Sequence, residues 1–250
     1  MDKRLEAFKR LLDIMDDLRQ KCPWDKKQTN ETLRYLTIEE TYELSDALLA
    51  NDNEEIKKEL GDLFLHLVFY SKIGEEKKAF TVTEVLNSVC EKLISRHPHI
   101  YGDVEVKDEE EVKQNWEELK LKEGNKSVLG GVPSSLPSLV KAMRMQDKAA
   151  QVGFDWPNKE QVWDKVEEEL TEFKEAATVR ESEEEFGDLI FSLVNYARWK
   201  KINPDDALER TNIKFKTRFE AIELFAKEKG IKMQEMTLAE MDAVWEQAKS

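Results

Sequence analysis

The chain has 250 residues, enough for one large domain or two of ordinary size. Of these residues 37% are charged and only nine are glycine, a composition that favours long solvated helices. A formal net charge of −14 argues against a protein that binds DNA or RNA polymers, because contact with a phosphate backbone needs Lys and Arg, but it permits a single nucleotide bridged to carboxylates by metal ions. No apolar run approaches the ~18 residues that span a bilayer, and the acid-containing start is neither signal nor transit peptide, so we expect a cytoplasmic protein without membrane contact.

The first predicted element is an amphipathic helix over residues 1–19, whose leucines and Phe8 form a stripe that we expect to face the core. Cys22 follows it, and Cys90 is the other cysteine. One disulfide between them is possible, but a chain of this size needs none, so we expect reduced thiols.

A helical hairpin with four acidic residues is predicted next. One arm carries the motif EExxE at residues 39–43, the other carries ExxD at residues 59–62, and the turn signal Asn51-Asp52-Asn53 lies between them. Because the arms are nearly equal in length, the carboxylates of the two motifs should lie level. The candidate metal ligands of this half are Glu40, Glu43, Glu59 and Asp62.

Lys92 and Arg96 follow, four residues apart and so on one helix face, and Trp116 stands near the end of this half. Residues 104–106 are the only short strand-like candidate, so we expect an all-α fold. A concentration of Gly, Pro and Ser predicts a linker over residues 123–137, between modules at residues 1–122 and 138–250.

The second half repeats the order of the first. Phe154-Asp155 corresponds to Trp24-Asp25, and EExxE at residues 168–172 precedes ExxD at residues 185–188, with a turn expected near residues 178–181. A Lys-x-x-x-Arg pair and a Trp then recur, which makes a two-copy tandem rather than a solenoid. The candidate residues of this half are Glu169, Glu172, Glu185 and Asp188 as metal ligands, and Lys214, Arg218 and Trp245 near a nucleotide.

The repeat also separates shared chemistry from local packing. His66 lies one turn after Asp62, but its counterpart is Ser192, and Cys22 corresponds to Val152. Neither His66 nor Cys22 is therefore expected to belong to the site.

The acids predict the kind of metal. Like charges on one helix face repel by about 0.2–0.5 kcal/mol per pair, and a divalent cation would relieve that repulsion. Oxygen-only ligands suit Mg²⁺, or Mn²⁺ in its place. Iron or zinc is not expected, because the di-iron pattern needs Glu-x-x-His on two helices and the chain has three histidines in all.

Each feature has a simpler alternative. An acidic motif is often a solvated face, although two copies with matched spacing favour a metal site. The Lys/Arg pairs are either surface residues or phosphate contacts, and their corresponding positions in an acidic chain favour the second. Trp116 and Trp245 either pack in a core or stack on a base.

At these residues the chain closely resembles the MazG family of nucleoside triphosphate pyrophosphohydrolases. The resemblance covers almost the whole length and rests on residues 22–29, 96–103 and 152–156 together with both acidic sets. It implies an all-α fold of two tandem MazG-type modules, with four-helix-bundle-like cores completed by dimerisation into a homodimer. It also implies Mg²⁺-dependent cleavage of ribo- and deoxyribonucleoside triphosphates to monophosphate and pyrophosphate, for house-cleaning or control of nucleotide pools.

The resemblance further implies roles for single residues. Lys165, Lys214 and Arg218 match positions that hold phosphates, with Lys92 and Arg96 as first-half counterparts of the last two, and the C-terminal module is the main catalyst. Two polar residues of that module are missing from the first, where Phe69 replaces Asn195 and Leu36 replaces Lys165. Asn195 is therefore a further candidate for substrate binding.

The expected reaction is hydrolysis at the α-phosphorus, with Lys214 and Arg218 stabilising phosphate charge. Glu168, one turn before Glu172, is a hypothetical base for the attacking water, on helical spacing alone. Two alternatives remain open: a non-catalytic nucleotide-sensing regulator, and a narrower dUTP or phosphoribosyl-ATP pyrophosphohydrolase.

Overall fold

The structure is a computed structural model that describes residues 2–108, 111–112, 115–116, 119 and 127–249. All regular structure in these residues is helical, and the chain divides into two compact units, residues 1–116 and 117–250. The all-α prediction is confirmed. Residues 104–106, the strand candidate, have no regular secondary structure. No helix of the described residues is long and apolar enough to cross a membrane.

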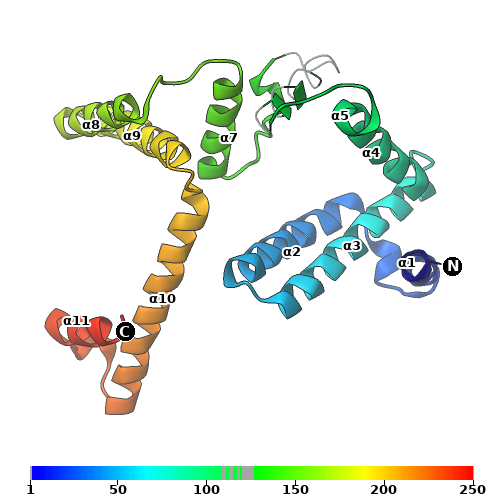
Figure 1. The fold of residues 1–250 in the computed structure, drawn as a ribbon. Helices are drawn as coiled ribbons and strands as arrows, with labels where there is room; N and C mark the ends of the chain where they lie inside the picture. The colour runs from blue at the N-terminus through cyan, green and yellow to red at the C-terminus, as the bar shows by residue number, and fades with distance from the viewer. Residues whose placement is uncertain (1, 109–110, 113–114, 117–118, 120–126, 250) are drawn as a thin grey trace. The chain divides into compact units, whose positions relative to one another are not determined.

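The first unit is built around a helical hairpin. Its elements are α1 (Lys3–Lys21), η1 (Asp25–Lys27), α2 (Asn30–Ala50), α3 (Asn53–Glu76), α4 (Val82–Arg96) and α5 (Pro98–Tyr101). Helices α2 and α3 lie side by side, and α1 packs on α3 (Figure 1).

The hairpin turn forms where the sequence predicts it. Asn51 ends α2 in the left-handed conformation, with φ of 56°, and the carboxylate of Asp52 accepts hydrogen bonds from the first backbone N–H groups of α3. Asn tolerates that conformation better than most residues, and Asp is a favoured N-cap. These two residues therefore fix the register of the two arms.

The core of the first unit lies between α1, α2 and α3. It consists of Met15, Leu33, Val68, Phe69 and Ile73. Phe8, Leu11 and Leu12 of α1 pack against it, as the stripe predicts, but Leu5 is 62% exposed, because it lies in the first turn of α1, short of this core. Cys22 and Cys90 are free thiols, as expected.

The second unit repeats the hairpin. Its elements are η2 (Leu129–Gly131), α7 (Ser138–Gln151), α8 (Lys159–Glu175), α9 (Val179–Trp199), α10 (Pro204–Lys229), η3 (Met233–Glu235) and α11 (Leu238–Gln247). Helix α7 packs on α9 as α1 packs on α3, whereas α10 extends from the end of α9 to α11 (Figure 1).

One detail differs from expectation. The turn between α8 and α9 comes at residues 176–178, slightly earlier than predicted, because the Thr178 hydroxyl and the Glu181 carboxylate form a capping box that starts α9. Of the expected linker, residues 123–126 lie outside the described residues, and residues 129–131 form η2 beside α7.

Candidate active site

The first acidic cluster joins the two arms of the α2–α3 hairpin. Glu40 and Glu43 of α2 and Glu59 of α3 each offer a carboxylate oxygen, and these atoms lie within 4.8 Å of one another. Asp62 is outside that group but near enough for its charge to raise the pKa of Glu40, after the larger effect of burial. The hairpin, with its two arms of nearly equal length, therefore brings three of the four predicted ligands together.

Glu59 is the most enclosed member, at 2% exposure. Lys58 Nζ lies 2.8 Å from Glu59 Oε1 and lowers the pKa of this carboxyl. The second oxygen, Oε2, is buried without a hydrogen-bond partner among the described residues. A buried carboxylate oxygen of this kind is a ready ligand for a cation.

The second cluster has the same composition and lies on α8 and α9. Carboxylate oxygens of Glu169, Glu172 and Glu185 lie within 4.8 Å of one another, and Asp188 stands one turn beyond Glu185. Partial burial raises the pKa of Glu185, and Glu172, Glu169 and Asp188 raise it further. The negative charges therefore oppose each other in both units.

A different cation balances each cluster. In the second unit Lys165 Nζ lies 2.6 Å from Glu169 Oε1 and 2.9 Å from Glu168 Oε1, and both contacts raise the pKa of Lys165. In the first unit Leu36 occupies the position that corresponds to Lys165. The lysine that pairs with the acidic cluster there is Lys58, which contacts Glu59. Lys165 is thus held at the edge of the acids by Glu169, and Glu168 is held with it.

Both clusters fit a hard divalent cation by their donor set. Three carboxylates from two helices converge with oxygen atoms only, which is the chemistry that Mg²⁺ prefers, and no His takes part in either group. The geometry of the acidic clusters does not distinguish the two units. A difference between the units must therefore come from the residues that surround the clusters.

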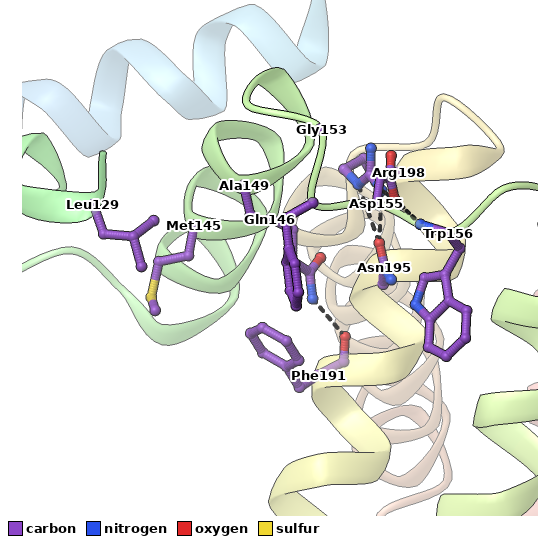
Figure 2. Close-up of a pocket in the computed structure, with 11 residues that line it drawn as sticks. Leu129, Met145, Gln146, Ala149, Gly153, Asp155, Trp156, Phe191, Asn195 and Arg198 are labelled. Atoms are coloured by element: carbon purple, nitrogen blue, oxygen red, sulfur yellow. Dashed lines mark hydrogen bonds and ion pairs between the residues drawn. The ribbon is translucent and has the colours of Figure 1, made fainter. Parts of the chain in front are cut away.

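A pocket of about 280 Å³ lies beside α3 in the first unit, and a larger one of about 540 Å³ opens beside α9 in the second. Residues of η2, α7, the segment 153–156 and α9 line it (Figure 2): Leu129, Met145, Gln146, Ala149, Gly153, Phe154, Asp155, Trp156, Phe191, Asn195 and Arg198. Its volume lies in the range of small-molecule sites. In the first unit the place of Asn195 is taken by Phe69, which is 2% exposed and belongs to the core.

The polar wall of the pocket is a fixed network (Figure 2). The Arg198 guanidinium donates to Asp155 Oδ1 and to Asn195 Oδ1, the latter at 2.9 and 3.1 Å, and Trp199 Nε1 donates to Asp155 at 3.3 Å. Asn195 is a predicted site residue, and Asp155 was indicated by the repeat and by the family resemblance, without a role. The sequence did not indicate Gln146 or Arg198 as site residues, because neither belongs to a local motif and only packing brings them to the pocket.

In each unit a predicted Arg lies beside the predicted Trp. The Arg218 guanidinium lies 5.5 Å from the Trp245 ring centroid, and Arg96 lies 5.4 Å from that of Trp116, so the duplication extends to this pair. Trp245 also packs on the α10–α11 core. Lys214, Arg218 and Trp245 belong to neither the acidic cluster nor the pocket lining within the chain, and Lys92 and Arg96 lie on α4, likewise outside the first cluster.

The chain is similar to known proteins over most of its length. The family model described as the MazG nucleotide pyrophosphohydrolase domain matches residues 28–101. The chain is similar to the nucleoside triphosphate pyrophosphohydrolase/pyrophosphatase MazG of Thermotoga maritima, with 43% identity over 97% of this chain and 95% of that protein. It is 37% identical to the nucleoside triphosphate pyrophosphohydrolase of Escherichia coli K12, over 98% of each. The uncharacterized protein YabN of Bacillus subtilis is 44% identical over 91% of this chain and 48% of its own length.

Proposed function

The chain belongs to the MazG family of nucleotide pyrophosphohydrolases, and we propose that its second unit cleaves nucleoside triphosphates, ribo- and deoxyribo-, to monophosphate and pyrophosphate with Mg²⁺. House-cleaning or control of nucleotide pools is the proposed purpose. Relatives over nearly the whole length carry the name of this enzyme, and the chain is an enzyme of that kind.

The observation that carries the proposal is the alignment of acids and pocket along α9. Asn195 comes seven residues after Asp188, which is close to two helical turns and about 10 Å on the same face. A nucleoside in the pocket would therefore direct its phosphates along α9 toward Asp188 and the cluster. The first unit has the acids but has Phe69 in place of Asn195, and its pocket beside α3 is smaller, at about 280 Å³, so we assign catalysis to the second.

The residues of the second unit divide the work as follows. Glu169, Glu172, Glu185 and Asp188 would hold Mg²⁺, which when bound supplies a Lewis acid for activating water and neutralising phosphate charge. Lys165, already beside Glu169, is placed to pair with a phosphate oxygen. Glu168 is proposed to accept the proton of the attacking water, oriented by its 2.9 Å contact with Lys165.

Lys214 and Arg218 remain proposed phosphate contacts, and Trp245 a proposed neighbour of the nucleotide. The chain holds them on α10 and α11, and the homodimer is the setting in which we propose that they act. Apolar side chains on the hairpins support such an assembly, since Phe64 and Leu67 of α3 are 54% and 59% exposed and Leu193 of α9 is 43% exposed. Sedimentation at the 29.2 kDa of one chain would contradict it.

The function is tested by pyrophosphate release from dATP and UTP with Mg²⁺. Glu172→Gln and Asp188→Asn should each lower the rate by about 100-fold or more, because each removes a charge that would hold the metal. Glu43→Gln, the matched variant of the first unit, should lower it far less. Unchanged rates with the second-unit variants, or an equal loss with Glu43→Gln, would show the assignment to be wrong.

The same assay separates the two alternatives. A nucleotide-sensing regulator would bind nucleotide and release no pyrophosphate. A narrower enzyme would use dUTP or phosphoribosyl-ATP alone, and a substrate panel would reveal it.

A further inference from the structure

Gln146 and Asn195 line the pocket of the second unit, and their partners leave opposite hydrogen-bonding ends of the two amides unpaired. We propose that Gln146 and Asn195 read the edge of the nucleobase, with Gln146 as the acceptor and Asn195 as the donor. This inference rests on the proposed function, because it concerns the nucleoside end of that substrate.

The orientation of Gln146 follows from its partner. Its Nε2 donates to the backbone oxygen of Phe191 at 2.8 Å, and a carbonyl can only accept, so Nε2 is the atom that faces α9 (Figure 2). Oε1 is left without a partner among the described residues, in a side chain of a residue only 7% exposed. An unsatisfied buried acceptor is unfavourable, so a ligand N–H that reaches Oε1 gains more than it would in water.

The orientation of Asn195 follows in the same way. Arg198 has donors only, so the atom that it contacts with Nε and Nη2 must be Asn195 Oδ1. Asn195 Nδ2 is then free of partners within the described residues and points away from Arg198. Asp155 holds Arg198 in place, so Asp155 and Arg198 are positioning residues for this donor.

A base fits this pair better than other chemistry does. Each nucleobase carries on its Watson–Crick edge an N–H donor beside an acceptor, which complements one acceptor and one donor on the protein. The same pocket contains Phe154 and Trp156, which are 82% and 40% exposed and offer ring faces on which a base stacks. Sugar hydroxyls have no planar face for such stacking.

The first unit lacks both amides at the corresponding positions. Phe69 replaces Asn195, and Asp16 replaces Gln146, with Asp16 Oδ1 paired to Lys72 Nζ at 2.6 Å. Asp16 therefore supplies a matched control position outside the proposed pocket.

The test compares two ligands that differ by one donor. Isothermal titration calorimetry with Mg²⁺ measures binding of the α,β-methylene analogues of ATP and of purine riboside triphosphate, which lacks the exocyclic amine. The wild-type chain should bind the ATP analogue about 3- to 10-fold more tightly, the value of one hydrogen bond. Gln146→Met should bring this ratio close to one, whereas Asp16→Met should keep it.

A second variant, at Asn195, tests the donor. It also keeps the proposal testable if the Gln146→Met protein does not fold. Asn195→Asp keeps an oxygen for Arg198 but replaces the free donor by an acceptor, so it should weaken binding of both analogues about 10-fold or more. A wild-type ratio of one, a folded Gln146→Met protein with the wild-type ratio, or wild-type binding by Asn195→Asp would each overturn the inference.

Pyrophosphate release from ATP is measured on the same protein. Release with a binding ratio of one overturns base reading and leaves the proposed function standing. A clear ratio without release overturns the proposed function and leaves base reading standing.

Discussion

Replacing Arg198 with Met would test the polar wall of the pocket. The Arg198 side chain is 15% exposed, and its guanidinium donates to two partners, the Asp155 carboxylate and the Asn195 amide. Met keeps most of the aliphatic volume of the side chain but removes every donor. The change therefore isolates the hydrogen bonds from the packing.

The expected loss follows from those bonds. Both partners accept from a charged guanidinium, and a hydrogen bond to a charged group contributes about 1.5–3 kcal/mol. The Asp155 side chain is 24% exposed and keeps its bond from Trp199, so its contribution lies at the low end of this range. We expect a loss of about 2–3 kcal/mol in the free energy of unfolding of the second unit, which lowers its thermal midpoint by about 6–10 °C.

Differential scanning calorimetry measures the midpoint, and pyrophosphate release measures KM and kcat. Because Asn195 loses its anchor while the acids are untouched, KM for ATP should rise about 10-fold and kcat should change less than about 3-fold. Lys72→Met is the matched control in the first unit. Its partners Asp16 and Glu75 are 61% and 55% exposed, so the cost should stay below about 1 kcal/mol. Equal midpoints for Arg198→Met and wild type, or a loss confined to kcat, would refute the reasoning.

Two further predictions concern Glu185 of the second acidic cluster and Phe69 of the first-unit core. Burial and neighbouring carboxylates raise the pKa of Glu185, so the charged form of this side chain destabilises the fold at high pH. Without divalent cations, Glu185→Gln should therefore raise the thermal midpoint at pH 8. The gain should vanish near pH 4.5, the ordinary pKa of a glutamate, where the carboxyl is largely protonated in the fold. Calorimetry at both pH values checks this, and an equal gain at each would contradict it. Phe69→Asn should cost the first unit about 3–4 kcal/mol in urea unfolding, because it leaves a cavity and buries an unpaired amide, and it should not add pyrophosphate release. An unchanged urea midpoint would speak against this account of the core.

The hairpins could be predicted because their signals are local. Asn51 and Asp52 encode a turn and a cap, and the arm lengths on either side of them place Glu43 level with Glu59. Leu5 shows the limit of the same approach, since periodicity gives the face of a helix but not how far the neighbouring core extends along it.

The pocket could not be predicted, because its residues meet only through packing. Gln146 bonds to a backbone oxygen 45 residues away, and Arg198 bonds to Asp155 43 residues away. The aligned repeat did indicate that Asn195 and Phe69 differ, but it could not show that one lines a cavity while the other fills a core.

The sequence by itself determined the helical hairpins and the two acidic sets, because turns, caps and helical periodicity act over a few residues. Only the tertiary structure decided that the larger pocket lies in the second unit and which amide atoms of its lining are left unpaired. Those facts depend on α7 lying against α9, and on partners whose donors and acceptors fix each amide, which no spacing along the chain specifies.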